Sequence, residues 1–214
     1  MSEQVRECAA MIEPVYLFEP GETSYSPLFI LVHGRAGNVR IMSGISRCLP
    51  PGSARLFIQA PVPDPIGGFS WWLLEDPDAD PWQASFALDR ILEEIIPQLG
   101  IEPRITAGIG FSQGGGVLGM ALQRNPRLLK GLALLASFVV RSPEPIPSGA
   151  APDVFIAHGS DDTVVTIDEA EKGARYLTTE LGWPTTMVVD SVGHKVGVQG
   201  MRGLKEWAIR MVME

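Results

Sequence analysis

Short apolar runs recur along the chain, and each is followed by a loop and then by a stretch long enough for a helix. The runs that we expect to form strands are 15–18, 28–32, 55–59, 105–109, 132–135, 154–157 and 186–189. Most of them are too continuously apolar for a sheet with one solvated face, so they predict central strands covered on both sides. Turn residues between the first two runs favour a pairing of 15–18 with 28–32.

Three further stretches carry apolar residues at helical spacing. Their expected buried faces are Phe86, Leu88, Leu92, Ile95 and Leu99; Ile167, Ala170, Ala174, Leu177 and Leu181; and Met201, Leu204, Ala208 and Met211. A fourth helix is expected after Ser112 although it contains Gly114, Gly115, Gly116 and Gly119. Each glycine costs about 1 kcal/mol against alanine inside a helix, so we expect this helix to approach neighbouring strands closely.

Strands that alternate with helices predict an α/β fold with a mostly parallel sheet. The 214 residues contain no linker-like stretch, so we interpret 1–214 as a single domain. A hydrophobic fraction of 45% with 20% charged residues is ordinary for a globular protein with a sizeable core. Helices are expected on both faces of the sheet.

The net charge of −8, with Lys and Arg scattered along the chain, argues against nucleic acid as a partner. The first ten residues lack an apolar stretch for a signal peptide, and no run is long enough to insert stably in a membrane. A cytoplasmic location is therefore expected. Cys8 and Cys48 are too few for a disulfide framework, and we interpret both as free thiols.

The pentapeptide Gly110-Phe111-Ser112-Gln113-Gly114 follows an apolar run and opens the glycine-rich helix. This arrangement is typical of a nucleophile elbow, in which a serine is held at a strained turn between a strand and a helix. Only residues without bulky side chains fit two positions before and after the serine, where Gly110 and Gly114 stand. The pattern predicts covalent catalysis by Ser112.

A serine nucleophile needs a histidine base and a carboxylate that fixes the base's tautomer. In an α/β-hydrolase the chain order is serine, acid, histidine, and only His194 follows the serine in the required place. Asp161 and Asp162 both lie just past the strand 154–157, where sites in open α/β sheets gather. We favour Asp162 and keep Asp161 as the alternative. Asp168 and Asp190 are interpreted as a residue at a helix start and a surface charge at a strand end.

Two backbone N–H groups should stabilise the oxyanion of the tetrahedral intermediate. The N–H of Gln113 directly follows the nucleophile, and the N–H of Arg35 lies in the turn 33–38 after the strand 28–32. Asn38 is expected to start a helix after this turn. His33 and His158 each precede a glycine at a strand end and are interpreted as packed residues that orient loops.

Trp71 and Trp72 lie between a proline-rich loop and an acidic stretch, and Phe138 and Val139 follow the strand 132–135. These four residues are candidates for substrate binding, with core packing as the alternative. The acidic stretch matches no recognised ligand pattern, and no phosphate-cradling motif occurs, so we expect no metal and no cofactor.

Taken together, the segments 31–38, 110–115, 158–165 and 193–194 resemble those of the carboxylesterase/phospholipase family of small α/β-hydrolases, which includes acyl-protein thioesterases. The resemblance implies a domain without a large lid, with Ser112 as nucleophile, His194 as general base and Asp162 as its partner. It also implies oxyanion donors at Arg35 and Gln113, and cleavage of carboxylic esters or thioesters through an acyl-enzyme. Three departures from the family pattern are Ala36, Gly116 and Lys195.

The expected substrate is therefore a small-molecule ester or thioester, and the leading hypothesis is an esterase for small to medium acyl chains. One alternative is a lysophospholipase or acyl-protein thioesterase, which would need an exposed apolar groove. A more remote alternative is a hydrolase fold that serves as a non-catalytic small-molecule receptor. The complete set of serine, acid and histidine disfavours the receptor.

Overall fold

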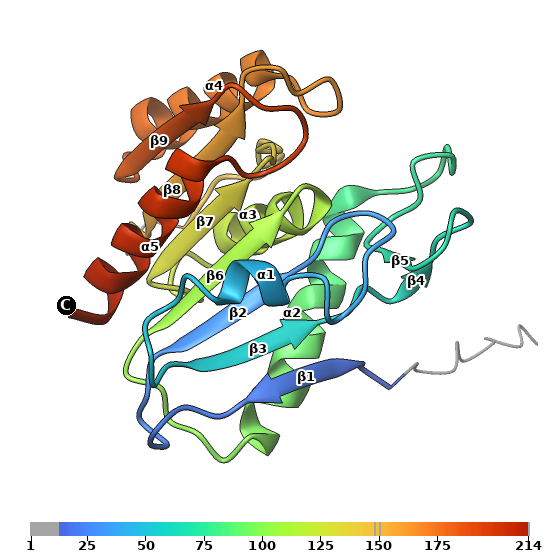
Figure 1. Cartoon of the computed structure of the whole chain (residues 1–214). Helices are drawn as coiled ribbons and strands as arrows, with labels where there is room; N and C mark the ends of the chain where they lie inside the picture. Colours follow the sequence, from blue (N-terminus) through green and yellow to red (C-terminus); the bar gives the residue numbers. More distant parts are fainter. Residues whose placement is uncertain (1–12, 148, 150, 214) are drawn as a thin grey trace, which may run out of the picture.

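The sheet contains seven strands in the order β1-β3-β2-β6-β7-β8-β9 (Figure 1). The structure is a computed structural model that describes residues 13–147, 149 and 151–213. The strands of this sheet are β1 (Tyr16–Glu19), β2 (Leu28–Val32), β3 (Ala54–Ile58), β6 (Thr106–Phe111), β7 (Gly131–Leu135), β8 (Asp153–Gly159) and β9 (Thr185–Asp190). All neighbouring pairs are parallel except β1 with β3. The predicted α/β fold is confirmed, and each of the seven expected strands is present within a few residues of its predicted bounds.

The predicted pairing of the first two strands is wrong. Strand β1 pairs with β3, in antiparallel orientation, while β2 lies between β3 and β6. Burial explains the difference, because all five residues of β2 are buried, whereas no residue of β1 is fully buried. A fully apolar strand is most stable between two neighbours, and a half-exposed strand suits the edge of the sheet.

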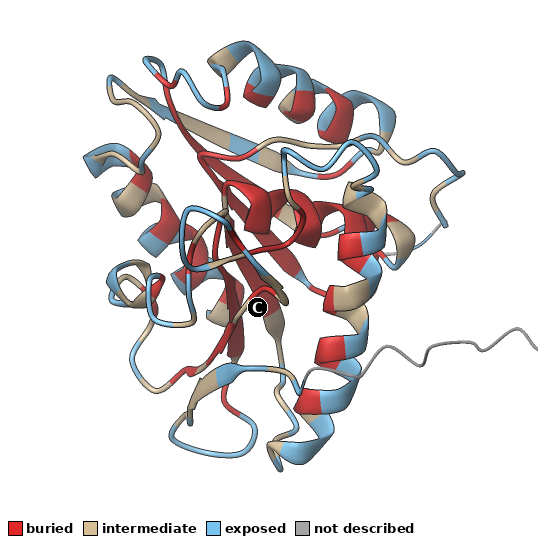
Figure 2. Ribbon diagram, turned by 90° about the vertical axis from the view of Figure 1, so that its right-hand side faces the viewer, coloured by how far each residue is buried: buried red, intermediate tan, exposed pale blue. Residues whose placement is uncertain are grey.

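Helices cover both faces of the sheet, and alternate strand residues contribute to one core or the other. The first core joins Leu28, Ile30 and Val32 to α2 (Pro81–Gln98) and α3 (Gln113–Arg124). The second joins Phe29 and Leu31 to α5 (Val198–Met213). Buried residues make up most of the five inner strands and line the inward sides of the flanking helices, whereas the edge strands β1 and β9 have no buried residue (Figure 2).

The three predicted helical faces are largely confirmed, with one wrong member. In α2, Leu88, Leu92 and Ile95 are buried, but Phe86 is 46% exposed. The guanidinium of Arg124 lies 4.1 Å from the centre of the Phe86 ring, so this ring makes a cation–π contact instead of filling the core. The second predicted face spans α4 (Ile167–Arg175) and the π-helix η1 (Tyr176–Glu180).

The remaining elements are short. Helix α1 (Ser43–Ser46) follows the turn after β2, and β4 (Val62–Pro63) pairs with β5 (Phe69–Ser70) as a separate two-stranded hairpin. Asn38 does not start a helix as predicted: its side chain accepts a hydrogen bond from the N–H of Arg40, two residues on, which closes an Asx turn instead.

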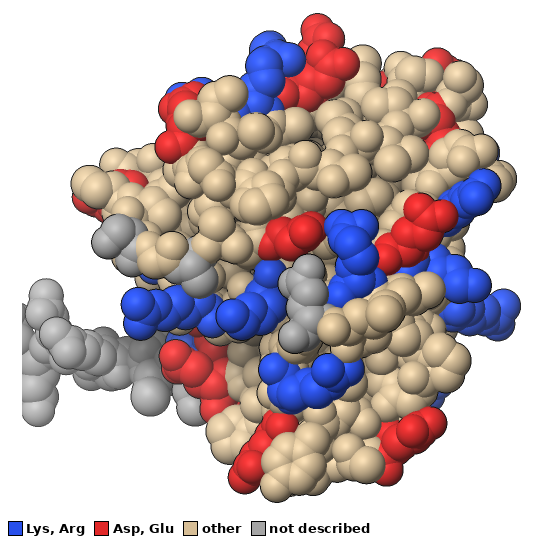
Figure 3. All heavy atoms as spheres, turned by 90° about the vertical axis from the view of Figure 1, so that its left-hand side faces the viewer, with Lys and Arg blue, Asp and Glu red and all other residues tan. Residues whose placement is uncertain are grey.

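Basic and acidic side chains lie next to one another on the surface. In the face shown in Figure 3, Lys and Arg cross the middle of the molecule with Asp and Glu beside them. Within the described ranges, no helix has both the length and the apolar character required to span a bilayer. Cys48 is a free thiol, as predicted, whereas Cys8 lies outside the described residues.

Candidate active site

Ser112 stands between the end of β6 and the start of α3 in a strained conformation, with φ 50° and ψ −122°. Its N–H donates to the carbonyl of Leu135 at 3.0 Å, which ties the turn to β7. A Cβ on Gly110 would overlap the backbone of Gly115, and a Cβ on Gly114 would overlap the carbonyl oxygen of Val32. Both flanking positions therefore require glycine, and this geometry is the predicted elbow.

The imidazole of His194 lies between Ser112 and Asp162. Its Nε2 is 3.1 Å from Ser112 Oγ, and its Nδ1 is 2.8 Å from Asp162 Oδ2. An ionised carboxylate only accepts hydrogen bonds, so the proton is on Nδ1 and Nε2 accepts from the serine hydroxyl. Ser112 and Asp162 are buried, and the His194 side chain is 22% exposed. The arrangement can deprotonate Ser112 as the serine attacks an acyl carbon.

The carboxylate of Asp162 is held by its own loop. Its Oδ1 accepts from the N–H groups of Val164 and Val165 at 2.8 and 3.0 Å. Burial acts to raise the pKa of Asp162, but the hydrogen bonds from His194, Val164 and Val165 outweigh it and hold that pKa below its ordinary value. Asp161 is exposed and accepts from the hydroxyl of Ser160. The structure therefore brings Asp162, and not Asp161, to the histidine.

The loop that carries His194 is held against the end of β8. The N–H of Asp161 donates to the carbonyl of Val192 at 3.1 Å, and a Cβ on Gly159 would overlap that same carbonyl. Gly159 is thus the glycine that lets the loop approach. A Cβ on Gly193, directly before His194, would make only an ordinary contact.

Arg35 and Gln113 both lie in segments that adjoin Ser112. Gly34 abuts the serine so closely that a Cβ on it would lie 3.0 Å from Ser112 Cβ, and Gln113 is the next residue in the chain. Neither N–H has a hydrogen-bond acceptor within the part of the chain that the structure describes. Two such N–H groups can bind an oxyanion.

His33 and His158 are fully buried. Nε2 of His33 accepts from the N–H of Ala60 at 3.0 Å, so Nδ1 carries the proton and donates to the carbonyl of Gly34 at 2.7 Å. Burial lowers the pKa of His33 more than the bond to Gly34 raises it, which keeps the ring neutral. His158 Nε2 donates to the carbonyl of Val165 at 2.9 Å. Both rings contact loops of the site, as expected of packed residues.

The four residues suggested for substrate binding divide into two kinds. Trp71 and Trp72 are 2% and 9% exposed and belong to the core. The Trp71 indole donates to the carbonyl of His33 at 2.9 Å, while the Gln113 side chain bonds the N–H of Trp71 and the carbonyl of Trp72. Through these hydrogen bonds the two tryptophans support the segments on either side of Ser112.

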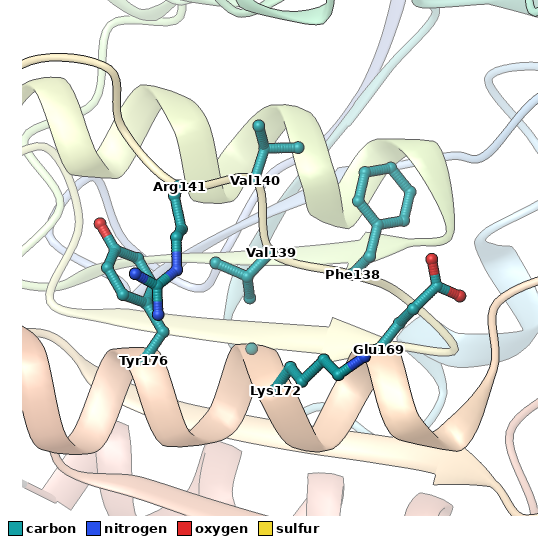
Figure 4. A pocket seen from close by; sticks show the side chains of 8 residues that line it. Phe138, Val139, Val140, Arg141, Glu169, Lys172 and Tyr176 are labelled. Carbon is teal, nitrogen blue, oxygen red and sulfur yellow. The ribbon is translucent and has the colours of Figure 1, made fainter.

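Phe138 and Val139 line a cavity of about 440 Å³ between the segment after β7 and α4 (Figure 4). Lys172, Tyr176 and Arg141 line it as well. The Phe138 ring packs edge-on against Trp72, with ring centres 6.2 Å apart. It also faces Gly116, because a Cβ there would overlap the ring. Phe138 thus connects the cavity to the first turn of the helix that follows Ser112.

Three polar residues that hold the segments around Ser112 did not stand out in the sequence. Ser137 Oγ donates to the carbonyl of Ser112 at 2.7 Å. Asp64 and Ser70 bind the turn that carries Arg35, and the Ser70 hydroxyl donates to the Asp64 carboxylate at 2.6 Å. The available signal for Ser137 was a small polar residue two positions after β7, the strand next to the elbow. Asp64 and Ser70 lie among prolines and glycines, where no periodicity marks them.

Comparisons with known proteins agree with the fold. The chain is 25% identical over 186 residues to the esterase YpfH of Escherichia coli strain K12, covering 82% of this chain and 78% of that protein. The esterase PE8 has a similar structure, with a TM-score of 0.81, 22% identity and coverage of 94% of this chain and 100% of that one. A Bacillus cereus carboxylesterase has a TM-score of 0.79 at 22% identity, with coverage of 95% and 96%. At that identity, the two structures establish the likeness of the fold.

The family assignment comes from the sequence between the hairpin β4–β5 and the end of α5. Residues 79–211 match the sequence profile described as Phospholipase/Carboxylesterase. This range contains the elbow, the Asp162 loop and the His194 loop. The chain belongs to the phospholipase/carboxylesterase family of α/β-hydrolases and is a hydrolase enzyme of the carboxylesterase type.

Proposed function

We propose that this hydrolase cleaves carboxylic esters of small to medium acyl chains through an acyl-enzyme on Ser112. In this mechanism His194 takes the proton of the Ser112 hydroxyl as the oxygen attacks the ester carbonyl, and then gives it to the leaving alcohol. Asp162 keeps the imidazole in the Nδ1–H tautomer and stabilises the imidazolium. A water molecule then attacks the acyl-enzyme by the same route, which releases the acid and restores the serine.

The single observation that carries the proposal is the position of His194 between Ser112 Oγ and Asp162 Oδ2, at 3.1 and 2.8 Å. The N–H groups of Arg35 and Gln113 support it as the oxyanion donors. Losing one such donor typically costs a factor of about 10² to 10³ in kcat. We further propose that Phe138 and Val139 contact the acyl or alcohol part of the substrate, because they line the cavity beside the helix that follows Ser112.

A second candidate is lysophospholipase or acyl-protein thioesterase activity. A long acyl chain needs an apolar groove, and Phe138, Val139 and Val140 form an apolar side of the cavity, which favours this candidate. The two candidates use the same nucleophile and differ in the chain length that they prefer.

A fluorophosphonate probe, which labels activated serines, tests the mechanism. We expect the wild-type protein to take one label and Ser112→Ala to take none, with p-nitrophenyl esters hydrolysed only by the wild type. An unlabelled wild type, or full labelling of the variant, would refute the proposal. A series of esters from acetate to palmitate then separates the candidates, since a rise in kcat/KM up to the longest chains would favour the lipid or acyl-protein substrate.

A further inference from the structure

The turn 34–37, which carries the Arg35 N–H, is fastened to the hairpin of β4 and β5. Gly37 and Phe69 exchange two backbone hydrogen bonds, at 3.1 and 2.8 Å. The N–H of Ala36 donates to Ser70 Oγ at 3.0 Å. Ala36 needs this support, because its φ of 56° lies in the left-handed region that residues other than glycine seldom adopt.

Asp64 orients the Ser70 hydroxyl, whose oxygen accepts the hydrogen bond from the Ala36 N–H. The Asp64 side chain is fully buried, and its Oδ2 accepts from Ser70 Oγ at 2.6 Å. Because a carboxylate only accepts, the single hydroxyl proton of Ser70 is committed to Asp64. The serine oxygen must then present a lone pair to the Ala36 N–H. A carboxylate at position 64 therefore sets the direction in which Ser70 holds the turn.

The same carboxylate also holds the side chain of Arg35. Its Oδ2 accepts from Arg35 Nε at 3.1 Å, and the guanidinium makes a second ion pair with the exposed Glu75. On the other side of Arg35, the Gly34 carbonyl is fixed by Nδ1 of His33. In a trans peptide the N–H points opposite to the carbonyl, so the Arg35 N–H points away from His33. The turn is thus fixed on both sides of this N–H.

We propose that Asp64 is a positioning residue for the hydrolytic reaction: through Ser70 and the Arg35 side chain, it holds the turn 34–37 so that the Arg35 N–H meets the oxyanion. This inference rests on the proposed function, since it concerns the donor of the Ser112 reaction. Asp64 itself does not touch the substrate. Its removal leaves the nucleophile, the base and the acid in place and weakens the binding of the tetrahedral intermediate.

The test uses Asp64→Ala and Ser70→Ala in the full-length protein. For p-nitrophenyl acetate we expect kcat to fall at least tenfold in both variants, while KM stays within about twofold, because the oxyanion forms only after binding. Asp64→Asn should recover part of the loss, since its amide oxygen can still accept from Ser70. An alkyl trifluoromethyl ketone, which adds to serine as a tetrahedral alkoxide, should bind more weakly by about the factor that kcat/KM loses.

The matched control is Ser85→Ala, which removes another fully buried serine hydroxyl, in α2. Its Oγ donates to the carbonyl of Trp82 in the same helix and accepts from Arg124 at the end of α3. We expect a comparable loss of melting temperature and an unchanged kcat. The concentration of active sites is measured by fluorophosphonate labelling, and kcat is calculated per labelled site, so that unfolded protein does not lower its value. If one of the two alanine variants fails to fold, the other still decides the matter.

The inference is refuted if a folded Asp64→Ala or Ser70→Ala enzyme keeps kcat within threefold of the wild type. It is also refuted if kcat falls while the affinity for the trifluoromethyl ketone is unchanged. Failure of the proposed function has a different signature, because the wild type itself would then take no label or Ser112→Ala would remain active. The two failures can therefore be told apart.

Discussion

Oδ2 of Asp162 lies 2.8 Å from Nδ1 of His194, whereas the neighbouring Asp161 accepts from Ser160 at the surface. We predict that Asp162→Asn lowers kcat by a factor of about 10³ to 10⁴, because an amide can favour the wrong imidazole tautomer. Asp161→Asn should stay within threefold of the wild type. Steady-state kinetics with a p-nitrophenyl ester measure both, and a larger loss for Asp161→Asn would exclude Asp162 as the acid.

Two glycines of α3 should respond to alanine in opposite directions. A Cβ on Gly119 meets nothing within 4 Å, so Gly119→Ala gains helix propensity and is expected to raise the unfolding free energy by up to about 1 kcal/mol. Gly114→Ala places its Cβ onto the carbonyl of Val32 and should lower both stability and kcat, because the elbow must shift. Urea denaturation compares the two variants, and a stabilised Gly114→Ala would contradict the description of the elbow.

The strands could be located from the sequence because buried strands are short, continuous apolar runs. Their order was harder to predict, because apolar content shows that a strand is buried but not which strands flank it. The turn residues between the two runs favour a pairing of 15–18 with 28–32, whereas β1 lies at the edge beside β3. In the same way, helical spacing predicts most of the buried face of α2 but cannot show that Phe86 packs against the guanidinium of Arg124.

The candidate site divides along similar lines. Ser112, Asp162 and His194 lie in motifs at strand ends, so their meeting at one edge of the sheet follows from the fold. The contact of Asp64 with Arg35 joins residues 29 positions apart through a hairpin of two-residue strands. No spacing pattern in the sequence predicts such a contact. Trp71 and Trp72 were ambiguous for a related reason, since a large aromatic residue suits a core as well as a pocket.

Phe138 offers a test of the substrate contact. We predict that Phe138→Ala changes kcat/KM for an acetate ester little but lowers it for a hexanoate ester several-fold, because each buried CH₂ group contributes about 0.8 kcal/mol. Phe86→Ala, which truncates an exposed phenylalanine on α2, is the control and should not alter the chain-length profile. Parallel profiles for Phe138→Ala and the wild type would place the acyl chain elsewhere.

Asp190 is more than the surface charge that its place at a strand end suggested. Its carboxylate accepts from the N–H groups of Gln199 and Gly200 at 3.1 and 2.8 Å, which caps the first turn of α5. Asp190→Ala should therefore cost about 1 to 2 kcal/mol of unfolding free energy. The control is Asp168→Ala in the first turn of α4, where Thr166 and Glu169 already form the cap. Equal losses in the two variants would argue against a capping role for Asp190.

The lowered pKa of Asp162 makes its contribution to stability depend on pH. Burial alone would raise this pKa, but the bonds from His194, Val164 and Val165 prevail. An unfolded aspartate has a pKa of about 3.9, so on acidification the unfolded chain takes up this proton before the folded protein does. The stabilisation is complete above about pH 5 and is lost as the pH falls through the folded pKa.

Urea denaturation at a series of pH values tests this dependence. The difference in unfolding free energy between the wild type and Asp162→Asn should become smaller below about pH 4, while Asp161→Asn follows the wild type. A gap that stays constant down to pH 3 would mean that the carboxylate of Asp162 is not stabilised in its ionised form.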